Sequence, residues 1–260
     1  MSHRPRKRFG QHFLHDQQVI SRIIESIAPQ PFEPLVEIGP GLGALTGGLL
    51  EHVRRLEVIE LDRDVIPELV ARVGNRGELI VHEADALNVD FGALAAGRQL
   101  RVCGNLPYNI STPLLFHLLE SAAHIADMHF MLQKEVVDRM AAGANDSAYG
   151  RLSVMLALAT EVEPLFDVGP GSFRPPPRVQ SAVVRLRPRT HAPFPLPDRP
   201  RFQRIVAQAF NQRRKTLRNS LRGLVDEAGF AAAGIDPIRR AETLSPAEFG
   251  LLATTTAPLT

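Results

Sequence analysis

Cysteine is nearly absent from the 260-residue sequence, and the sequence contains no long apolar run. The one cysteine, Cys103, excludes a disulfide scaffold and any zinc site built from several cysteines. The most apolar stretch, 113–132, carries three histidines and two acids, so we do not expect it to span a membrane. The basic N-terminus has no apolar run behind it, which indicates no secretory signal. We therefore expect a cytoplasmic protein.

Lysine is also scarce, with three lysines beside 27 arginines, and the charges are unevenly spread. Residues 1–8 hold four basic groups and no acid, residues 9–171 have a net charge of −11, and residues 172–222 have +12. The last segment, 223–260, has −3. A concentrated positive region is typical of proteins that bind a polyanion, because neutralised phosphates release counterions. Arginine also stacks on bases and pairs with phosphates better than lysine does, so the pattern favours nucleic-acid binding.

Several catalytic motifs are missing from the sequence. Its nine histidines form no HExxH motif and no ligand-like cluster with cysteine, so we expect no metal site. It also has no GxSxG elbow and no Walker loop. Cys103 ends an apolar run, and we expect it in the core rather than in a reactive site.

Apolar periodicity predicts strands that alternate with helices, and therefore an α/β fold with a mostly parallel sheet. The predicted strands are 35–38, 56–61, 79–82, 100–103 and 128–132. The predicted helices are 16–27 with Asp16 as N-cap, 44–52, 65–73, 113–121 with Ser111 as N-cap, and 151–159. Two β-rich runs, 162–168 and 181–186, have no room for a helix between them, so we expect them to close the sheet as an antiparallel pair.

The domain organisation follows from the same patterns. Residues 1–187 are expected to form the α/β domain, with 1–30 as a helical and basic extension at its start. Residues 188–198 are rich in proline and predict a linker. Residues 199–260 are expected to form a small helical domain.

A glycine-rich loop and two acids predict a nucleoside site. Gly39 and Gly41 follow the first predicted strand and precede a helix, which lets a ligand approach the backbone closely. Glu60 lies 21 residues after Gly39, where an acid can hold a ribose diol, and Asp85 follows the third strand at the same sheet edge. The GxGxG spacing departs from the GxGxxG of most NAD sites and suits S-adenosylmethionine, but an NAD-type oxidoreductase stays open at this point.

The segment 104–109 follows the strand at 100–103 and contains Asn105, Leu106, Pro107 and Tyr108. An adenine N6 amine is a poor nucleophile unless acceptors engage its hydrogens, and an Asn side-chain oxygen plus a backbone carbonyl can do this. A proline keeps the turn rigid, and the aromatic ring can stack on an extruded base. The plain alternative is an ordinary turn. Behind a GxGxG loop, the segment favours an adenine-N6 methyltransferase.

The sequence resembles the ribosomal RNA adenine N6,N6-dimethyltransferases, and within them the bacterial branch that dimethylates two adjacent adenosines near the 3′ end of small-subunit (16S) rRNA. The resemblance covers about residues 6–250 and rests on GQHFL (10–14), EIGPGLG (37–43), EADA (83–86), GNLPYNIS (104–111), SFRPPPRV (172–179) and FNQRRKTLR (210–218). It implies a Rossmann-like class I methyltransferase sheet with a small C-terminal helical domain.

The resemblance also implies residue roles and partners. S-adenosylmethionine would be the cofactor, and the small ribosomal subunit or its precursor the substrate of a monomeric enzyme. Asn105, Leu106, Pro107 and Tyr108 would be catalytic, with Tyr108 and Phe173 stacking on the target base. The cofactor would contact His12, Leu14, Gly39, Gly41, Glu60, Asp85, Ala86 and Asn105. The RNA would contact Arg174, Arg178, Arg213, Arg214, Lys215 and Arg218.

One departure and two further alternatives accompany this interpretation. Many family members have Asn where this chain has His12; because histidine titrates near neutral pH, we hypothesise a pH-dependent cofactor affinity. A non-enzymatic ribosome-assembly factor on the same fold is one alternative. The related branch that methylates large-subunit rRNA and confers antibiotic resistance is the other.

Overall fold

A computed structural model describes residues 12–212 and 214–254 of the chain, which divides into two compact units. The first contains the described residues up to Val137 together with Glu163–Pro188, and the second contains Asp138–Val162 and the described residues from Arg189 onward. The segment 138–162 therefore groups with the C-terminal helices, whereas the sequence placed it in the α/β domain. The predicted functional division at 187/188 stays a prediction.

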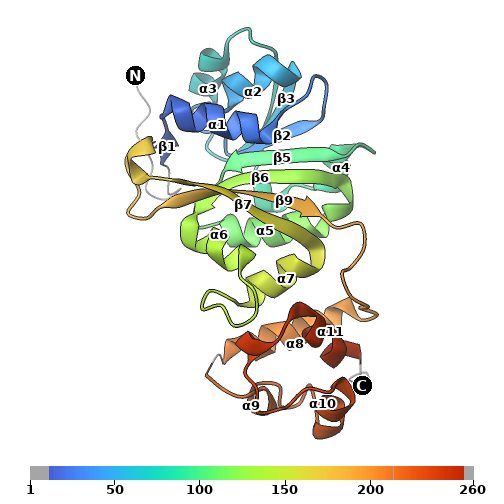
Figure 1. Ribbon diagram of the computed structural model, residues 1–260. Coiled ribbons are helices and arrows are strands. Elements are labelled where there is room, and N and C mark those ends of the chain that lie inside the picture. Colours follow the sequence, from blue (N-terminus) through green and yellow to red (C-terminus); the bar gives the residue numbers. More distant parts are fainter. Residues whose placement is uncertain (1–11, 213, 255–260) are drawn as a thin grey trace. The chain divides into compact units, whose positions relative to one another are not determined.

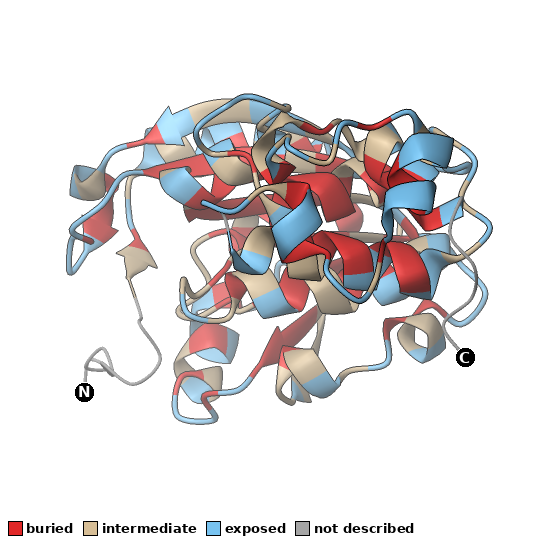
Figure 2. Cartoon of the chain, turned by 90° about the horizontal axis from the view of Figure 1, so that it is seen from below, coloured by how far each residue is buried: buried red, intermediate tan, exposed pale blue. Residues whose placement is uncertain are grey.

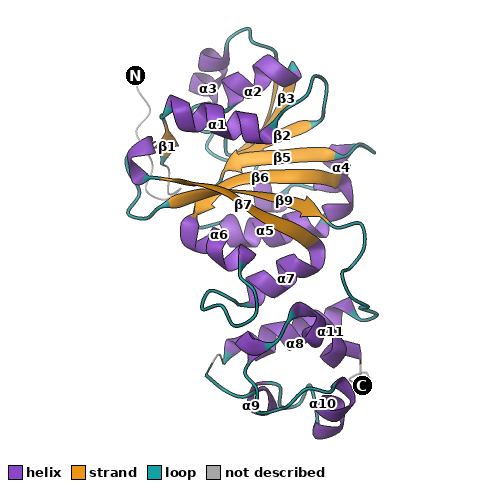
Figure 3. Cartoon of the chain, in the orientation of Figure 1, coloured by secondary structure: helices purple, strands orange, loops and turns teal. Residues whose placement is uncertain are grey.

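The first unit is built on a seven-stranded sheet (Figures 1 and 3) with the order β4-β3-β2-β5-β6-β9-β7. Its strands are β2 (Leu35–Ile38), β3 (Arg55–Glu60), β4 (Glu78–Glu83), β5 (Leu100–Asn105), β6 (Ile125–Gln133), β7 (Thr160–Val168) and β9 (Ser181–Pro188). The pairs β2–β3, β2–β5, β3–β4 and β5–β6 are parallel, and β9 runs antiparallel to β6. The predicted α/β sheet, mostly parallel and closed by the last two long strands, is confirmed.

One helix precedes β2, and the others lie in the connections between the strands. The helices are α1 (Gln17–Ile27), α2 (Thr46–Val53), α3 (Ile66–Val73), α4 (Phe91–Ala95), α5 (Ser111–Glu120) and α6 (Lys134–Ala141). Asp16 caps α1 as predicted, because its carboxylate accepts from the backbone N–H groups of Gln18 and Val19. Ser111 is not the cap of α5: it is the first helical residue, and its hydroxyl donates to the carbonyl of Tyr108.

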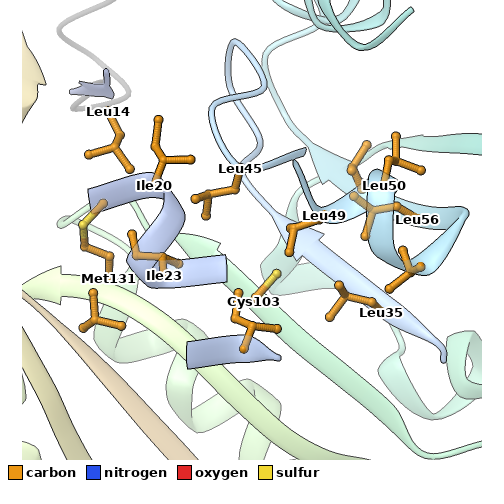
Figure 4. Packing of buried hydrophobic residues seen from close by; sticks show 14 of the residues in the cluster. Leu14, Ile20, Ile23, Leu35, Leu45, Leu49, Leu50, Leu56, Cys103 and Met131 are labelled. Atoms are coloured by element: carbon orange, nitrogen blue, oxygen red, sulfur yellow. The ribbon is translucent and has the colours of Figure 1, made fainter. Parts of the chain in front are cut away.

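Apolar residues of α1, α2 and α3 pack together against one face of the sheet (Figure 4). Ile20, Ile23 and Ile27 of α1 lie on one stripe because three and four residues make about one helical turn. They share a cluster with strand residues such as Leu56 and with Cys103, which is buried as expected. Figure 2 shows buried positions along the strands and inner helix faces. Each such aliphatic side chain contributes roughly 1.5–3 kcal/mol of hydrophobic free energy.

A second, two-stranded sheet joins the start of the described chain to a distant loop. Strand β1 (Phe13–Leu14) pairs antiparallel with β8 (Phe173–Arg174). The backbone N–H of His15 donates to the carbonyl of Ser172 at 3.0 Å, which extends this connection. Strands of two residues have no readable period, so the sequence did not predict this sheet.

The second unit is helical apart from the start of β7. It contains α7 (Arg151–Ala159), α8 (Arg199–Asn211), α9 (Leu217–Ser220), α10 (Glu227–Ala233) and α11 (Pro246–Thr254). Its core combines aliphatic residues with the aromatic side chains of Tyr149, Phe202, Phe230 and Phe249. The hydroxyl of Tyr149 donates to the carbonyl of Leu244 at 2.8 Å, which satisfies the buried phenol. The helical C-terminal segment predicted from sequence is thus present in the described residues.

Candidate active site

A cavity of about 1480 Å³ opens at the carboxyl ends of β2, β3, β4 and β5. Cavities for one small ligand usually measure about 300–1,000 Å³, so this cavity has room for more than one. Its lining includes most of the residues that the sequence predicted for the site: His12, Leu14, Gly39, Gly41, Glu60, Asp85, Ala86, Asn105, Leu106, Pro107, Tyr108 and Arg174. Because the four strands are adjacent and parallel, their tips lie side by side in the order Asp85, Glu60, Gly39, Asn105.

The glycine loop after β2 adopts a backbone shape that side chains disfavour. Gly39 and Gly41 have φ angles of 66° and 53°, in the left-handed region that favours glycine. A Cβ at Gly41 would lie 3.2 Å from the ring of Phe13. The N–H of Gly39 donates to the carbonyl of Ile59 on β3 at 2.9 Å, which fixes the loop against the neighbouring strand. At Gly39 and Gly41 the loop therefore presents bare backbone to the cavity.

Glu60 ends β3 with its carboxylate turned toward this loop. One oxygen accepts from the N–H of Gly41 at 3.1 Å, and the other accepts from the N–H of Asp62 at 2.8 Å. Burial raises the pKa of Glu60, while these two hydrogen bonds oppose the rise. Each carboxylate oxygen can accept more than one hydrogen bond, so Glu60 retains capacity for a ligand's hydroxyl groups.

Glu37 is a cavity residue that the sequence reasoning did not assign. It lies within β2, two residues before Gly39, is almost fully buried, and accepts a hydrogen bond from the Thr46 hydroxyl at 2.7 Å. Burial raises its pKa to about 7, and the nearby charge of Glu60 adds to the rise. An acid inside an otherwise apolar strand was the signal that could have identified it.

Asp85 and Ala86 follow β4. The Asp85 carboxylate accepts from the N–H of Leu87 at 3.0 Å and thereby caps a short 3-10 helix, Ala86–Asn88. This contact engages one carboxylate oxygen and holds the side chain at the cavity wall. Asp85 is thus both a helix cap and a polar group that a ligand in the cavity can reach.

The turn after β5 lies directly against the glycine loop. A Cβ at Gly39 would be 3.8 Å from the carbonyl oxygen of Asn105 and from Cδ of Pro107. The N–H of Leu106 donates to the carbonyl of Met131 at 3.2 Å, so the neighbouring strand β6 fixes the turn. A Cβ at Gly104 would meet the carbonyl oxygen of Ile38 at 2.3 Å, so only glycine lets β5 approach β2 this closely.

Distant segments hold the side chains of this turn. Nδ2 of Asn105 donates to the carbonyl of His12 at 3.3 Å, and Nδ1 of His12 donates to the carbonyl of Pro175 at 2.8 Å. The rings of His12 and Tyr108 are stacked, with centroids 5.8 Å apart and planes at 28°. The Tyr108 hydroxyl shares a 2.7 Å hydrogen bond with the Ser181 hydroxyl. Because Nδ2 makes the bond to His12, the amide oxygen of Asn105 is the atom that can accept from a ligand.

Phe173 does not fit its predicted stacking role. It is 2% exposed, pairs through β8 with β1, and packs in the apolar cluster with Leu14, so it does not line the cavity. Alternation explains the difference: neighbouring strand residues face opposite sides, and Arg174 takes the side that faces the cavity. Tyr108 is therefore the one predicted stacking residue at the cavity among those described.

The predicted RNA-binding residues divide between the two units. Arg174 and Arg178 are exposed in the first unit. Arg214, Lys215 and Arg218 are exposed in the second, where Nε of Arg218 pairs with Glu227 at 2.7 Å. Arg213 lies outside the described residues.

The cavity's polar groups fit S-adenosylmethionine. The Glu60 carboxylate suits ribose hydroxyls, the Asp85 carboxylate suits an exocyclic amine, and the exposed backbone of Gly39 and Gly41 admits the amino-acid end. Across 12–212 and 214–254 no group of three or more His, Cys, Asp or Glu side chains could hold a metal ion. In the same residues no helix is long and apolar enough to cross a membrane.

The family model described as "Ribosomal RNA adenine dimethylase" matches residues 2–257. The chain belongs to the ribosomal RNA adenine dimethylase family. It is therefore an rRNA adenine methyltransferase, and S-adenosylmethionine is its methyl donor.

Named relatives of the same family cover nearly the whole chain. "Ribosomal RNA small subunit methyltransferase A" of Laribacter hongkongensis (strain HLHK9) is 56% identical over 250 residues, which span 96% of this chain and 95% of that protein. The protein of the same name from Pseudomonas putida (strain KT2440) is 55% identical over 252 residues, spanning 96% and 94% of the two chains. The family resemblance inferred from the sequence motifs is confirmed.

Solved structures confirm the fold. A dimethyladenosine transferase from Plasmodium falciparum superimposes with a TM-score of 0.76 and 25% identity, over 93% of this chain and 96% of that one. The 23S rRNA methyltransferase ErmE gives a TM-score of 0.73 and 26% identity, over 93% and 98%. The fold is thus shared with a dimethyladenosine transferase and with a 23S rRNA methyltransferase.

Proposed function

We propose that this enzyme dimethylates N6 of two adjacent adenosines near the 3′ end of small-subunit (16S) rRNA. The proposal rests on one observation: Asn105 and the Gly39 loop lie next to each other in the lining of one cavity. Methyl transfer requires such an arrangement, because the acceptor base and the methyl donor have to lie side by side. The choice of the small subunit is supported by the relatives that share more than half of their residues with this chain.

The residues after β5 would bind and orient the target base. The amide oxygen of Asn105 and the carbonyl of Leu106 would accept the two N6 hydrogens and direct the nitrogen lone pair toward the cofactor side of the cavity. The ring of Tyr108 would stack on the adenine. These groups are fixed before the base arrives, so the rate gain would come from positioning and electrostatics rather than from a strong base.

The residues at the tips of β2, β3 and β4 would hold the cofactor. Glu60 would bind the ribose hydroxyls, Asp85 the adenine amino group, and Gly39 with the segment from His12 to Leu14 would flank the methionine end. S-adenosylmethionine supplies an electrophilic methyl group on a positively charged sulfur. Addition of a second methyl group needs space beside Asn105, and the target N6 loses one of its N–H groups. The volume of the cavity would therefore decide whether the product is monomethylated or dimethylated.

The exposed basic residues would bind the rRNA backbone. Arg174 lines the cavity, so it would contact nucleotides next to the flipped base. Arg178, Arg213, Arg214, Lys215 and Arg218 would neutralise phosphates farther along the substrate. The net charge of +12 in 172–222 supports this assignment. We propose that a monomer in the cytoplasm carries out the reaction, because one chain supplies both the cavity and the basic residues.

The likeness to ErmE supports large-subunit rRNA as a second candidate substrate. Incubation of the enzyme with labelled S-adenosylmethionine and either unmethylated small subunits or unmethylated large subunits, followed by nucleoside mass spectrometry, tests the choice. We expect N6,N6-dimethyladenosine in the small subunits alone. Label confined to large subunits would contradict the proposal, and no label with either subunit would favour the non-enzymatic assembly factor.

A further inference from the structure

The hydroxyl groups of Tyr108 and Ser181 are 2.7 Å apart, although the two residues are 73 positions apart in the chain. Ser181 is fully buried at the first position of β9, while Tyr108 lies in the turn after β5 and lines the cavity. A hydrogen bond of this length between two hydroxyls is well formed. It connects a buried, fixed group to a ring at the cavity, the ring that would stack on the target base.

Ser181 is held in place by the sheet. It stands opposite Gln133 in the antiparallel pairing of β6 and β9, and the N–H of Lys134 donates to the carbonyl of Gln180 at 2.9 Å. The backbone on both sides of the serine is therefore part of the hydrogen-bonded ladder. The same strand β6 also accepts the N–H of Leu106, so the anchor and the catalytic turn share one support.

The Tyr108 ring needs such an anchor because its backbone contacts do not fix it. The Ser111 hydroxyl holds the carbonyl of Tyr108 at 3.1 Å, which sets the backbone but leaves the ring free to rotate about two side-chain bonds. The His12 ring stacks on Tyr108 and limits motion on that side. The bond from the far end of the ring to Ser181 removes the remaining freedom.

We propose that Ser181 is a positioning residue for methyl transfer, which holds the Tyr108 ring in the orientation that stacks the target adenine. This proposal rests on the proposed function, since it requires a flipped adenine. Ser181 contacts neither the base nor the cofactor and acts through Tyr108. Its loss leaves the ring to be ordered during each binding event, which slows transfer. Burial raises the pKa of Tyr108, so the phenol stays protonated and the hydrogen bond persists at physiological pH.

A double-mutant cycle tests this assignment. Ser181→Ala, Tyr108→Phe and the double variant are compared by the single-turnover rate of methyl transfer to small subunits. Each single variant removes one partner of the same hydrogen bond, and we expect each to lower the rate roughly threefold to tenfold, the factor for one uncharged hydrogen bond. The double variant is expected to lose no more than either single variant.

Ser153→Ala is the matched control for the loss of a buried hydroxyl, because Ser153 is equally buried but lies in α7 and does not line the cavity. We expect it to keep the wild-type transfer rate, and Ser181→Ala to keep wild-type cofactor affinity. Independent losses that multiply in the double variant would overturn the proposal, as would an unchanged rate in Ser181→Ala. Absence of transfer by the wild-type enzyme would instead overturn the proposed function.

Discussion

The two sides of the cavity are built from contacts of different range. On the cofactor side, the carboxylate of Glu60 bonds to Gly41, 19 residues away, and that of Asp85 bonds to Leu87, two residues away. On the acceptor side, Asn105 bonds to His12, 93 residues away, and Tyr108 bonds to Ser181, 73 residues away.

Because the two sides depend on different contacts, substitutions on one side should have separate effects from substitutions on the other. The ribose and adenine end of the proposed cofactor site needs only the parallel strands and their loops, because Glu60 and Asp85 are held by neighbours at the strand tips. The acceptor side needs three distant segments to come together around one turn. Changes on the cofactor side should therefore alter cofactor affinity, and changes on the acceptor side should alter transfer.

Asn105→Ala is expected to have the largest effect. It removes the only side-chain acceptor proposed for the N6 hydrogens, and the loss of one such preorganised group lowers kcat by about 10²–10³-fold. Because Asn105 is also a predicted cofactor contact, cofactor affinity measured by calorimetry should fall too, but only by about threefold to tenfold, the range for one uncharged hydrogen bond. An equally large loss of cofactor affinity would show that the two sides are not separable.

Glu60→Gln should have the next largest effect, on the opposite side. The charge-assisted hydrogen bonds proposed between its carboxylate and the ribose hydroxyls would be replaced by uncharged ones. This should weaken cofactor binding about tenfold or more, while kcat at saturating cofactor stays near the wild-type value. Glu78→Gln is the control, because Glu78 is exposed at the amino end of the adjacent strand β4. A fall in kcat with unchanged affinity would contradict this division of roles.

Glu37→Gln should reduce the pH dependence of stability. The pKa of Glu37 rises from 4.5 to about 7 on folding, so the folded state favours the protonated form. This contribution to the free energy of unfolding is complete below about pH 4.5 and is lost as the pH rises through about 7, by up to ~3 kcal/mol. Glutamine resembles the protonated acid and can still accept from Thr46. Urea unfolding between about pH 5 and 8 should show a smaller decline in the variant; parallel declines would refute the assignment.

His12→Asn should have the smallest effect. It removes the ring stacked on Tyr108 but keeps the backbone carbonyl that accepts from Asn105, so we expect a loss in transfer rate of about tenfold or less. The same variant tests the pH hypothesis for cofactor binding. Affinities measured from about pH 5.5 to 8 should vary less in the variant, and identical curves would remove the hypothesis.

The same contrast in range explains how much of the molecule the sequence could predict. Asp16, Gly39 and the strands of the parallel sheet were predictable because caps, glycine turns and apolar periods are local signals. The site residues on the strand tips followed from strand order in an α/β fold. By contrast, the pairing of β1 with β8, the burial of Phe173 and the bond from Tyr108 to Ser181 depend on segments far apart in the chain. No local sequence pattern encodes contacts between distant segments, and a strand of two residues is too short to show an alternation of apolar and polar residues.

The sequence has two tyrosines and no tryptophan, and the structure places one tyrosine in each compact unit. Tyr108 lies at the cavity and Tyr149 is buried among the helices of the second unit. Light that tyrosine absorbs and phenylalanine does not will therefore excite one side chain per unit, with no indole to accept the energy. Replacing either phenol with phenylalanine leaves an intrinsic fluorescence signal that belongs to a single unit, so substrate capture and helical unfolding can be followed separately without attaching a dye.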